Sequence, residues 1–173
     1  MVRIFGSDVL RVSEWSFSAW VKPTTDVRSA ILFQRNVFSI WRNPGGAISV
    51  SRGAPPNGAL ESFGTVPLNT WTHVGVVADD GWANIFINSS NVGKVQLSSL
   101  PGTSALIYPV VLGCRAQDRT CQSHAFTGEM DNVALFDRPL HVSENSKFYT
   151  DGTSWFTPTR EVCGVTDGNC DGI

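Results

Sequence analysis

The fold is decided by residues 126–140, FTGEMDNVALFDRPL. Read with the two-residue period of a strand, Asp131, Val133 and Leu135 share one face, so we expect Asp131 to point into the core beside aliphatic neighbours. An unpartnered carboxylate costs several kcal/mol to remove from water. Asp131 must therefore bind a cation, pair with a charge or accept several hydrogen bonds. Pro139 closes the strand because it has no N–H to donate to a ladder.

Alternating apolar and polar residues continue outward from this stretch in short segments about ten residues apart, a spacing typical of a β-sandwich. Turn-forming residues separate these segments. Further strands are expected at 2–5, 9–12, 16–23, 30–34, 37–42, 47–51, 69–78, 82–88, 92–97 and 109–114. Only residues 142–149 have a helical pattern, with Ser143 placed to cap it. We predict an all-β, antiparallel two-sheet sandwich of about twelve strands, with one short helix near 142–149.

Length and composition indicate one main domain. The chain has 173 residues, 42% of them hydrophobic and only 16% charged, which suits a globular domain rich in turns. We assign residues 1–152 to this domain. From 153 to 173 the sequence shifts to Thr, Pro, Gly and Cys, which indicates a linker or the start of a further module.

The charge balance excludes some partners. Net charge is −2, from 13 basic and 15 acidic residues, and no two basic residues are adjacent. A chain of this kind does not hold a phosphate backbone, so we predict no nucleic-acid binding. No stretch approaches the roughly 20 apolar residues that span a bilayer, so we predict no membrane insertion. No basic-then-apolar signal segment opens the sequence either.

Four cysteines occur as two close pairs, Cys114 with Cys121 and Cys163 with Cys170. Four cysteines allow three pairings, and proximity in the chain favours the two local disulfides. Zinc-type CxxC spacing is absent, which argues against a metal site built from these thiols. Two disulfides predict an extracellular or otherwise oxidising location. The alternative is four reduced, unrelated thiols.

Three segments resemble, in order, the laminin G-like (LamG) family within the concanavalin A-like lectin and glucanase fold. SFSAWVKP from Ser16 resembles its early strand, NTWTHVGVV from Asn69 its Trp-x-His-Val strand, and FTGEMDNVALFDRPL its last strand. The resemblance covers about residues 1–150 and implies a jelly roll. Relatives commonly have Asp-Gly where this chain has Asn88-Ser89, which removes one carboxylate from the candidate ligands.

The calcium-bearing members of this fold imply a structural Ca2+ site at Asp131, completed by Asp8 and by backbone oxygens near Gly6. Calcium takes six to eight oxygen ligands, so backbone carbonyls must supply several of them. The alternative is a buried Asp131 bonded to backbone amides. Residues 167–172, DGNCDG, also follow the opening of an EF-hand-type loop but lack its late bidentate acid, which leaves a solvated turn as the alternative.

Glu129 and Asp131 resemble part of the Glu-x-Asp-x-x-Glu or Glu-x-Asp-x-Glu motif of the glucanases of this fold. Glycoside hydrolysis needs two carboxylates in set positions, and Val133 and Ala134 occupy the places of the second Glu. We therefore predict that the chain is not an enzyme. The histidines come without a nucleophile elbow, and His73, on an alternating strand, is expected to be a packed, hydrogen-bonded imidazole.

Asn88-Ser89-Ser90 is an acceptor pattern for N-glycosylation in a predicted turn. Trp20, Trp41 and Trp82 alternate with residues of mixed polarity. Their rings could stack on sugars across a binding face, or they could pack between layers.

These observations favour a non-catalytic extracellular recognition or adhesion module that binds a glycan or an extracellular protein through loops 79–82 and 115–124. The candidate rim residues are Asp79, Asp80, Trp82, Arg115, Asp118 and Arg119. One alternative is a structural subunit of an extracellular assembly that self-associates through edge strands. Another is a degenerate β-glucanase.

Overall fold

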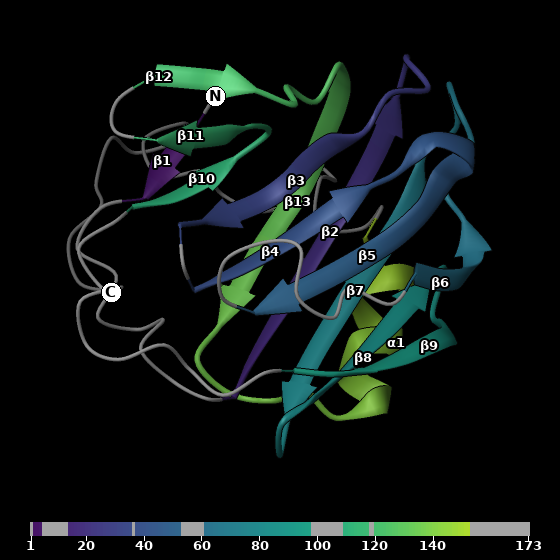
Figure 1. The fold of residues 1–173 in the computed structure, drawn as a ribbon. Helices are drawn as coiled ribbons and strands as arrows, with labels where there is room; N and C mark the ends of the chain where they lie inside the picture. Colours follow the sequence, from purple (N-terminus) through teal and green to yellow (C-terminus); the bar gives the residue numbers. More distant parts are fainter. Residues whose placement is uncertain are drawn as a thin grey trace, which may run out of the picture.

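The computed structural model is a two-layer β-sandwich with one helix (Figure 1). It describes residues 2–4, 14–35, 37–52, 61–97, 109–117 and 120–152. Several predicted features lie outside the described residues: strand 9–12, the 153–173 segment with Cys163 and Cys170, the 167–172 loop, Gly6, Asp8, Asp118 and Arg119.

All strand pairs are antiparallel. The first sheet runs in the order β1 (Val2–Ile4), β10 (Val110–Leu112), β3 (Ser29–Gln34), β4 (Phe38–Arg42), β5 (Ala47–Arg52) and β6 (Glu61–Thr65). The second runs in the order β13 (Gly128–Phe136), β2 (Trp15–Pro23), β7 (Thr72–Asp79), β8 (Trp82–Ile87) and β9 (Ser90–Gln96). A separate hairpin joins β11 (Arg115–Gln117) to β12 (Thr120–Ser123), and a 3-10 turn spans Pro44–Gly46. The predicted all-β sandwich is confirmed, and β6 is a strand that the sequence pattern did not predict.

The main hydrophobic core fills the space between the two large sheets. Alternate residues of β2, namely Phe17, Ala19 and Val21, are fully buried there, as the period-two pattern of 16–23 predicts. They pack with Val74 and Val76 of the neighbouring β7 and with the inner residues of β4 and β5. Removal of this apolar surface from water is the main force that holds the two layers together.

The last strand, β13, contains a β-bulge that its sequence pattern does not predict. Met130 lies opposite Val21, and Leu135 lies opposite Phe17. Between these two pairs the chain advances five residues along β13 but only four along β2, so β13 contains one extra residue. Asn132, inside the irregular stretch, has φ 50°, a left-handed conformation that asparagine tolerates better than most residues.

The bulge overturns the predicted orientation of Asp131. A one-residue shift exchanges the two faces of a strand, so Met130 and Leu135 pack against the core. Asp131 lies opposite Trp20 on the outer face and is half-buried, and Val133 is 37% exposed. The prediction that Asp131 and Val133 share the core face with Leu135 is therefore wrong.

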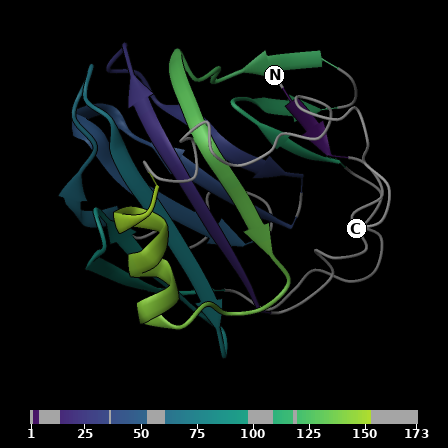
Figure 2. The same ribbon diagram turned by 180° about the vertical axis from the view of Figure 1, so that it is seen from behind.

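Helix α1 (Val142–Thr150) begins where the sequence predicts and lies across the outer face of the five-stranded sheet (Figure 2). Its N-cap is His141 rather than Ser143: the His141 Nδ1 accepts from the Ser143 N–H at 3.3 Å, and the Glu144 carboxylate accepts from the His141 N–H at 2.8 Å. This reciprocal pair is a capping box. Among the described residues, no helix has the length and apolar character needed to cross a membrane.

The predicted disulfide between Cys114 and Cys121 is not formed. Cys121 is exposed, whereas Cys114 is buried beside Val111. Cys121 lies opposite Ala116, and Arg115 lies opposite Ser123, so Cys114 falls level with residue 124. At 3.3 Å per residue this offset is roughly 10 Å, beyond the roughly 7 Å between Cα atoms that a disulfide can bridge. Extracellular location stays a prediction.

Candidate ligand-binding site

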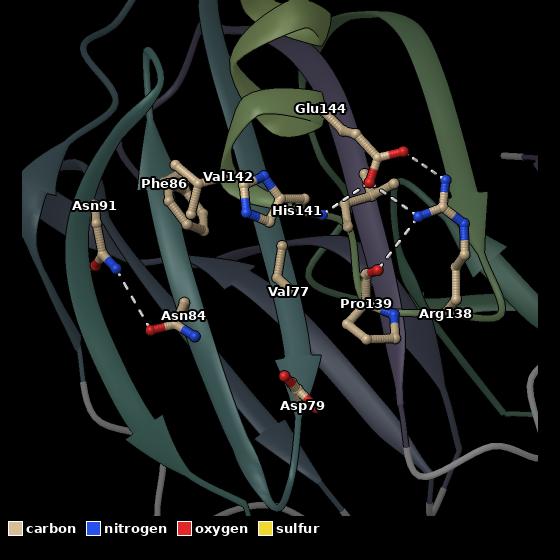
Figure 3. A pocket seen from close by; sticks show the side chains of 11 residues that line it. Val77, Asp79, Asn84, Phe86, Asn91, Arg138, Pro139, His141, Val142 and Glu144 are labelled. Atoms are coloured by element: carbon tan, nitrogen blue, oxygen red, sulfur yellow. Dashed lines mark hydrogen bonds and ion pairs between the residues drawn. The ribbon is translucent and has the colours of Figure 1, made fainter.

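An open pocket of about 470 Å3 lies on the outer face of the five-stranded sheet, beside the start of α1 (Figure 3). The pocket occupies the part of this face that the helix leaves uncovered. It is lined by Val77 and Asp79 of β7, Asn84 and Phe86 of β8, Asn91 of β9, and Arg138, Pro139, Leu140, His141, Val142 and Glu144.

The floor of the pocket is apolar. Val77 and Phe86 point outward from neighbouring strands and pack with Leu140 in a small cluster separate from the main core. Ser16 holds the segment after β13 above them: its hydroxyl donates to the Arg138 carbonyl at 2.9 Å and accepts from the Leu140 N–H at 2.8 Å. A β2 side chain thus positions one wall of the pocket.

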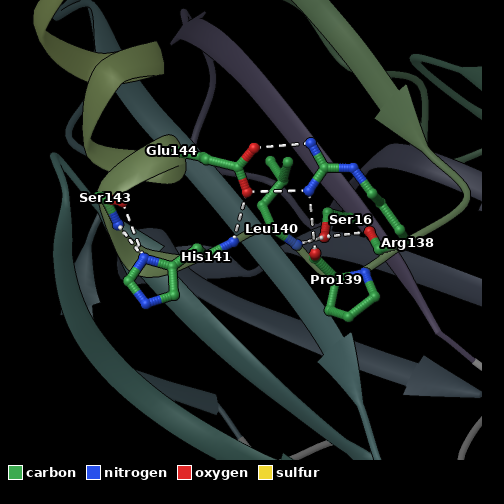
Figure 4. A network of polar contacts seen from close by, with 7 residues as sticks. All are labelled: Ser16, Arg138, Pro139, Leu140, His141, Ser143 and Glu144. Carbon is green, nitrogen blue, oxygen red and sulfur yellow. Dashed lines mark hydrogen bonds and ion pairs between the residues drawn. The ribbon is translucent and has the colours of Figure 1, made fainter.

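An exposed ion pair stiffens this wall (Figure 4). The Arg138 guanidinium donates to both Glu144 carboxylate oxygens, at 2.7 and 2.9 Å. This bidentate contact, with the His141 N–H second, lowers the pKa of Glu144 to about 2, and the same carboxylate raises the pKa of Arg138. Glu144 is therefore a fixed anion at neutral pH that joins the helix to the 138–141 segment.

Polar groups with spare hydrogen-bonding capacity surround the floor. Asn84 accepts from the Asn91 amide at 3.4 Å, which leaves the Asn84 NH2 group without an acceptor among the described residues. The exposed Asp79 carboxylate forms no hydrogen bond or ion pair in that part of the chain, and His141 lies across the pocket from Asn84 (Figure 3). An apolar floor bordered by carboxamide and carboxylate groups suits a polar ligand with an apolar face.

Comparison with known proteins places the fold in a family. The family model Laminin_G_3, described as the concanavalin A-like lectin/glucanases superfamily, matches residues 2–144. The chain belongs to this family. No curated protein sequence matches this Laminin_G_3 chain.

Solved structures share its architecture at low sequence identity. The CBM40 domain of the Ruminococcus gnavus IT-sialidase, bound to alpha2,3 sialyllactose, is 14% identical at TM-score 0.66, over 82% of this chain and 85% of that one. Domain 4 of AbnA, a GH43 extracellular arabinanase from Geobacillus stearothermophilus, bound to arabinotriose, is 21% identical at TM-score 0.59, over 81% and 69%. A Bacteroides ovatus protein named for an inferred carbohydrate-binding role is 13% identical at TM-score 0.63, over 84% of this chain and 42% of that chain.

The structure divides the predicted rim of this Laminin_G_3 domain into two parts. Asp79 lines the pocket, and Asp80 and Trp82 complete the adjacent β7–β8 turn. Trp82 is 37% exposed, with the Lys94 Nζ 4.7 Å from its ring centre. Arg115, in β11, lies at the opposite end of the sandwich in both views (Figures 1 and 2). Loops 79–82 and 115–124 therefore do not form one rim.

Sequence reasoning missed Asn84, Asn91 and His141. Strand alternation could have placed Asn84 on the same face as Trp82, because both are even-numbered positions of β8. The position of His141 depends on how the 138–141 segment folds back over the sheet, which no local pattern encodes.

Two of the three candidate tryptophans pack inside the domain. Trp41 is 2% exposed. Trp20 stacks on Tyr149 of α1 with ring centres 5.6 Å apart. Only Trp82 of the three is available to a ligand on an open surface.

Asp131, the predicted calcium ligand, accepts a backbone hydrogen bond. The Asp131 carboxylate accepts from the Asn132 N–H at 2.9 Å, in line with the backbone-bonded alternative. Within the described ranges, no group of three or more His, Cys, Asp or Glu side chains could hold a metal ion. Because Asp8 and Gly6 lie outside those ranges, the calcium site stays a prediction.

A buried serine–histidine pair lies beneath α1. Ser18 Oγ and His73 Nε2 are 2.8 Å apart, and both residues are buried. Among the described residues the other ring nitrogen, Nδ1, has no hydrogen-bond partner, so no acid in that part of the chain orients the ring. Burial lowers the pKa of His73 to about 4. The prediction of a packed, hydrogen-bonded imidazole is confirmed.

Asn88 occupies the turn between β8 and β9 and is exposed. Its side-chain oxygen accepts from the His73 N–H at 3.0 Å. Glycosylation at Asn88 stays a prediction. Glu129, the other carboxylate of the glucanase-like motif, is exposed and pairs with Lys22 at 2.9 Å.

Proposed function

We propose that this chain is a non-catalytic carbohydrate-binding module and that the pocket over β7, β8 and β9 is its glycan site. The observation that carries the proposal is the pocket itself: an apolar floor of Val77 and Phe86 bordered by Asp79, Asn84 and Asn91. The jelly-roll fold, which this chain shares with the CBM40 domain and the arabinanase domain, supports it.

The chemistry of the pocket matches that of a sugar. A sugar ring has an apolar C–H face and a ring of hydroxyl groups that both donate and accept hydrogen bonds. The amides of Asn84 and Asn91 can do the same, and the Asp79 carboxylate accepts. The exposed Trp82 ring, at the start of β8 beside the pocket, extends this surface with an aromatic face that costs little entropy to order.

The carboxylates of the pocket do not suit hydrolysis. A glycosidase needs one carboxyl group protonated as an acid and a second as nucleophile or base. Glu144 is held as an anion by Arg138, with a pKa of about 2, so it cannot donate a proton near neutral pH. Asp79 alone cannot supply both roles. Binding without conversion is therefore the function proposed, in an extracellular setting.

Glycan microarray screening followed by calorimetric titration tests this proposal. We expect binding to at least one neutral glycan, weakened about tenfold by Asn84→Ala, which removes a hydrogen bond to the ligand, and by Asp79→Asn, which replaces a charge-assisted acceptor with a weaker neutral one. Asp80→Asn is the matched control: Asp80 is exposed in the same turn but does not line the pocket, so its loss should change affinity less than twofold.

Two results would contradict the proposal. One is an array without a response. The other is a bound glycan whose affinity is the same in the Asn84→Ala and Asp79→Asn variants as in the parent, which would move the site elsewhere. Self-association without a glycan response would instead favour the structural-subunit alternative.

A further inference from the structure

Three basic side chains gather at the end of the sandwich opposite the pocket. They are Arg28 before β3, Arg115 in β11 and His124 after β12, here called the basic cluster. The strands that hold them are close: the Ala30 N–H donates to the His124 carbonyl at 2.9 Å, and Arg115 lies opposite Ser123. Figures 1 and 2 both place β11 and β12 away from the β7–β8 turn.

Trp41 is the platform of this cluster. The Arg28 guanidinium carbon lies 4.8 Å from the centre of the Trp41 ring, and the His124 ring centre lies 5.4 Å from it at a steep angle. Trp41 is buried, so it cannot move away from either group. The cation–π contact of Arg28 and the edge-on contact of His124 with Trp41 order two side chains that would otherwise be mobile.

Within the described part of the chain, the charges of Arg28 and Arg115 are not compensated. Arg42 pairs with Asp26 at 3.0 Å and Arg138 with Glu144 at 2.7 Å, whereas Arg28 and Arg115 form no ion pair in the part of the chain that the structure describes. Arg115 also buries its Nε–H without a hydrogen-bond acceptor. Positive groups gathered without an anion repel one another, and a buried orphan donor adds a further cost.

His124 is affected by the neighbouring charges and has a strained backbone conformation. Burial, then the charges of Arg115 and Arg28, lower its pKa. Its backbone has φ 54°, a left-handed conformation, and the Ser123 hydroxyl lies 2.8 Å from its Nδ1. The Nε2 atom is left without a partner among the described residues. Strain and unpaired polar atoms at one place are typical of a ligand site.

We propose that the basic cluster binds the oxyanion of an acidic glycan, a carboxylate or a sulfate group. Two guanidinium groups offer planar pairs of donors that match the oxygens of such a group, and the His124 ring adds a third contact. A bound anion would also offset the repulsion within the cluster. That the anion is carried by a sugar rests on the proposed function; the affinity of the cluster for an oxyanion does not.

Titration of the intact chain with three lactose-based probes tests this site. The probes are sialyllactose for a carboxylate, sulfated lactose for a sulfate and lactose as the neutral control. Binding is followed by the side-chain NMR signals of His124. We expect at least one acidic probe to shift these signals. At 50 mM salt its affinity should be at least tenfold above that of lactose, and this affinity should fall as the salt concentration rises.

Variants separate the cluster from the pocket. Arg28→Ala and Arg115→Gln should each weaken the acidic probe about tenfold or more. Arg28→Lys keeps the charge but loses the paired donors, so its affinity for the acidic probe should lie between those of the parent and of Arg28→Ala. Lys147→Ala, an exposed change of the same charge on α1, should leave affinity within twofold. Because Arg28→Ala uncovers Trp41, Arg115→Gln serves as the second, independent variant.

The outcomes are distinct. A response to sialyllactose alone assigns a carboxylate, one to sulfated lactose alone assigns a sulfate, and either supports the proposal. No shift of His124 with either acidic probe, or equal losses in Lys147→Ala and Arg115→Gln, would overturn it. Acidic-probe binding that Asn84→Ala leaves unchanged would support the basic cluster even if the glycan pocket failed its own test.

Discussion

The outer face of the five-stranded sheet has a covered half and an open half. In the covered half, α1 lies over β2 and β7 and buries Ser18, His73 and its own Asn145. In the open half, the end of β7 with β8 and β9 presents Asp79 and Asn84 to solvent around the pocket. Both halves come from the same strand alternation, with polar residues facing outward.

Burial decides what these polar residues can do. Beneath the helix, four polar atoms lack hydrogen-bond partners in the part of the chain that the structure describes: Trp20 Nε1, His73 Nδ1 and both amide atoms of Asn145. Such groups are sealed from ligands and reduce stability. In the open half, water satisfies the same kinds of group until a ligand replaces it. On this face, helix docking rather than residue type therefore decides which polar residues are structural and which can bind a ligand.

Gly75→Ala should disrupt the packing of α1 on the covered half and have the largest effect on stability. A Cβ at this position would meet the Asn145 amide oxygen, because Gly75 lets the helix approach β7 closely. We expect a loss of about 3 kcal/mol in unfolding free energy from this overpacking, measured by urea denaturation. Adding Asn145→Ala removes the clash, so the double variant should regain most of the loss. A double variant as unstable as Gly75→Ala would show that the contact is not the cause.

The second-largest effect should be a loss of folding stability in acid, caused by the buried His73 of the covered half. The pKa of His73 is lowered to about 4 in the folded chain, so between pH 6.5 and 4 the unfolded chain binds more protons. Stability should therefore fall as pH drops, by about 2 kcal/mol between pH 7 and 5 from His73. Urea denaturation at both pH values checks this. His73→Gln should flatten the slope, and a slope as steep in His73→Gln as in the parent would contradict this assignment.

Matched truncations compare the halves directly. Ser18→Ala leaves the His73 Nε2 without its hydrogen bond in a buried place, so we expect a loss of about 1–2 kcal/mol. Asn84→Ala acts at a solvated surface, so we expect a change within about 0.5 kcal/mol. Chemical denaturation of both variants measures the contrast. Equal losses would mean that α1 does not determine the difference.

The Arg138–Glu144 ion pair lies at the boundary between the halves, and its removal should have a small effect on stability. Glu144→Gln breaks an exposed ion pair with Arg138, so the melting temperature should drop by less than in Ser18→Ala. The difference from the parent should shrink in 1 M salt, since exposed pairs are screened. The pKa of Glu144 is lowered to about 2, so its stabilising contribution is present above pH 4.5 and is lost as pH falls toward 2. A salt-independent difference would contradict this interpretation.

Local patterns predicted much of the architecture. Alternation placed Phe17, Ala19 and Val21 in the core, and the helix starts at Val142 as expected. The same reasoning failed at Asp131, because the bulge in β13 reverses the faces, and at Cys114, whose distance from Cys121 depends on the register of a hairpin. The pocket residues Asn84 and His141 come from segments that only the folded chain brings together.

By itself, the sequence determined most of the segments that become strands, where the helix begins and which β2 side chains enter the core. These follow from the spacing of apolar residues and turn formers over a few positions, which is a local property. Only the tertiary structure decided which way Asp131 points, which outward residues α1 covers and which basic side chains meet at Trp41. Those outcomes depend on contacts between residues far apart in the chain, whose geometry no local period records.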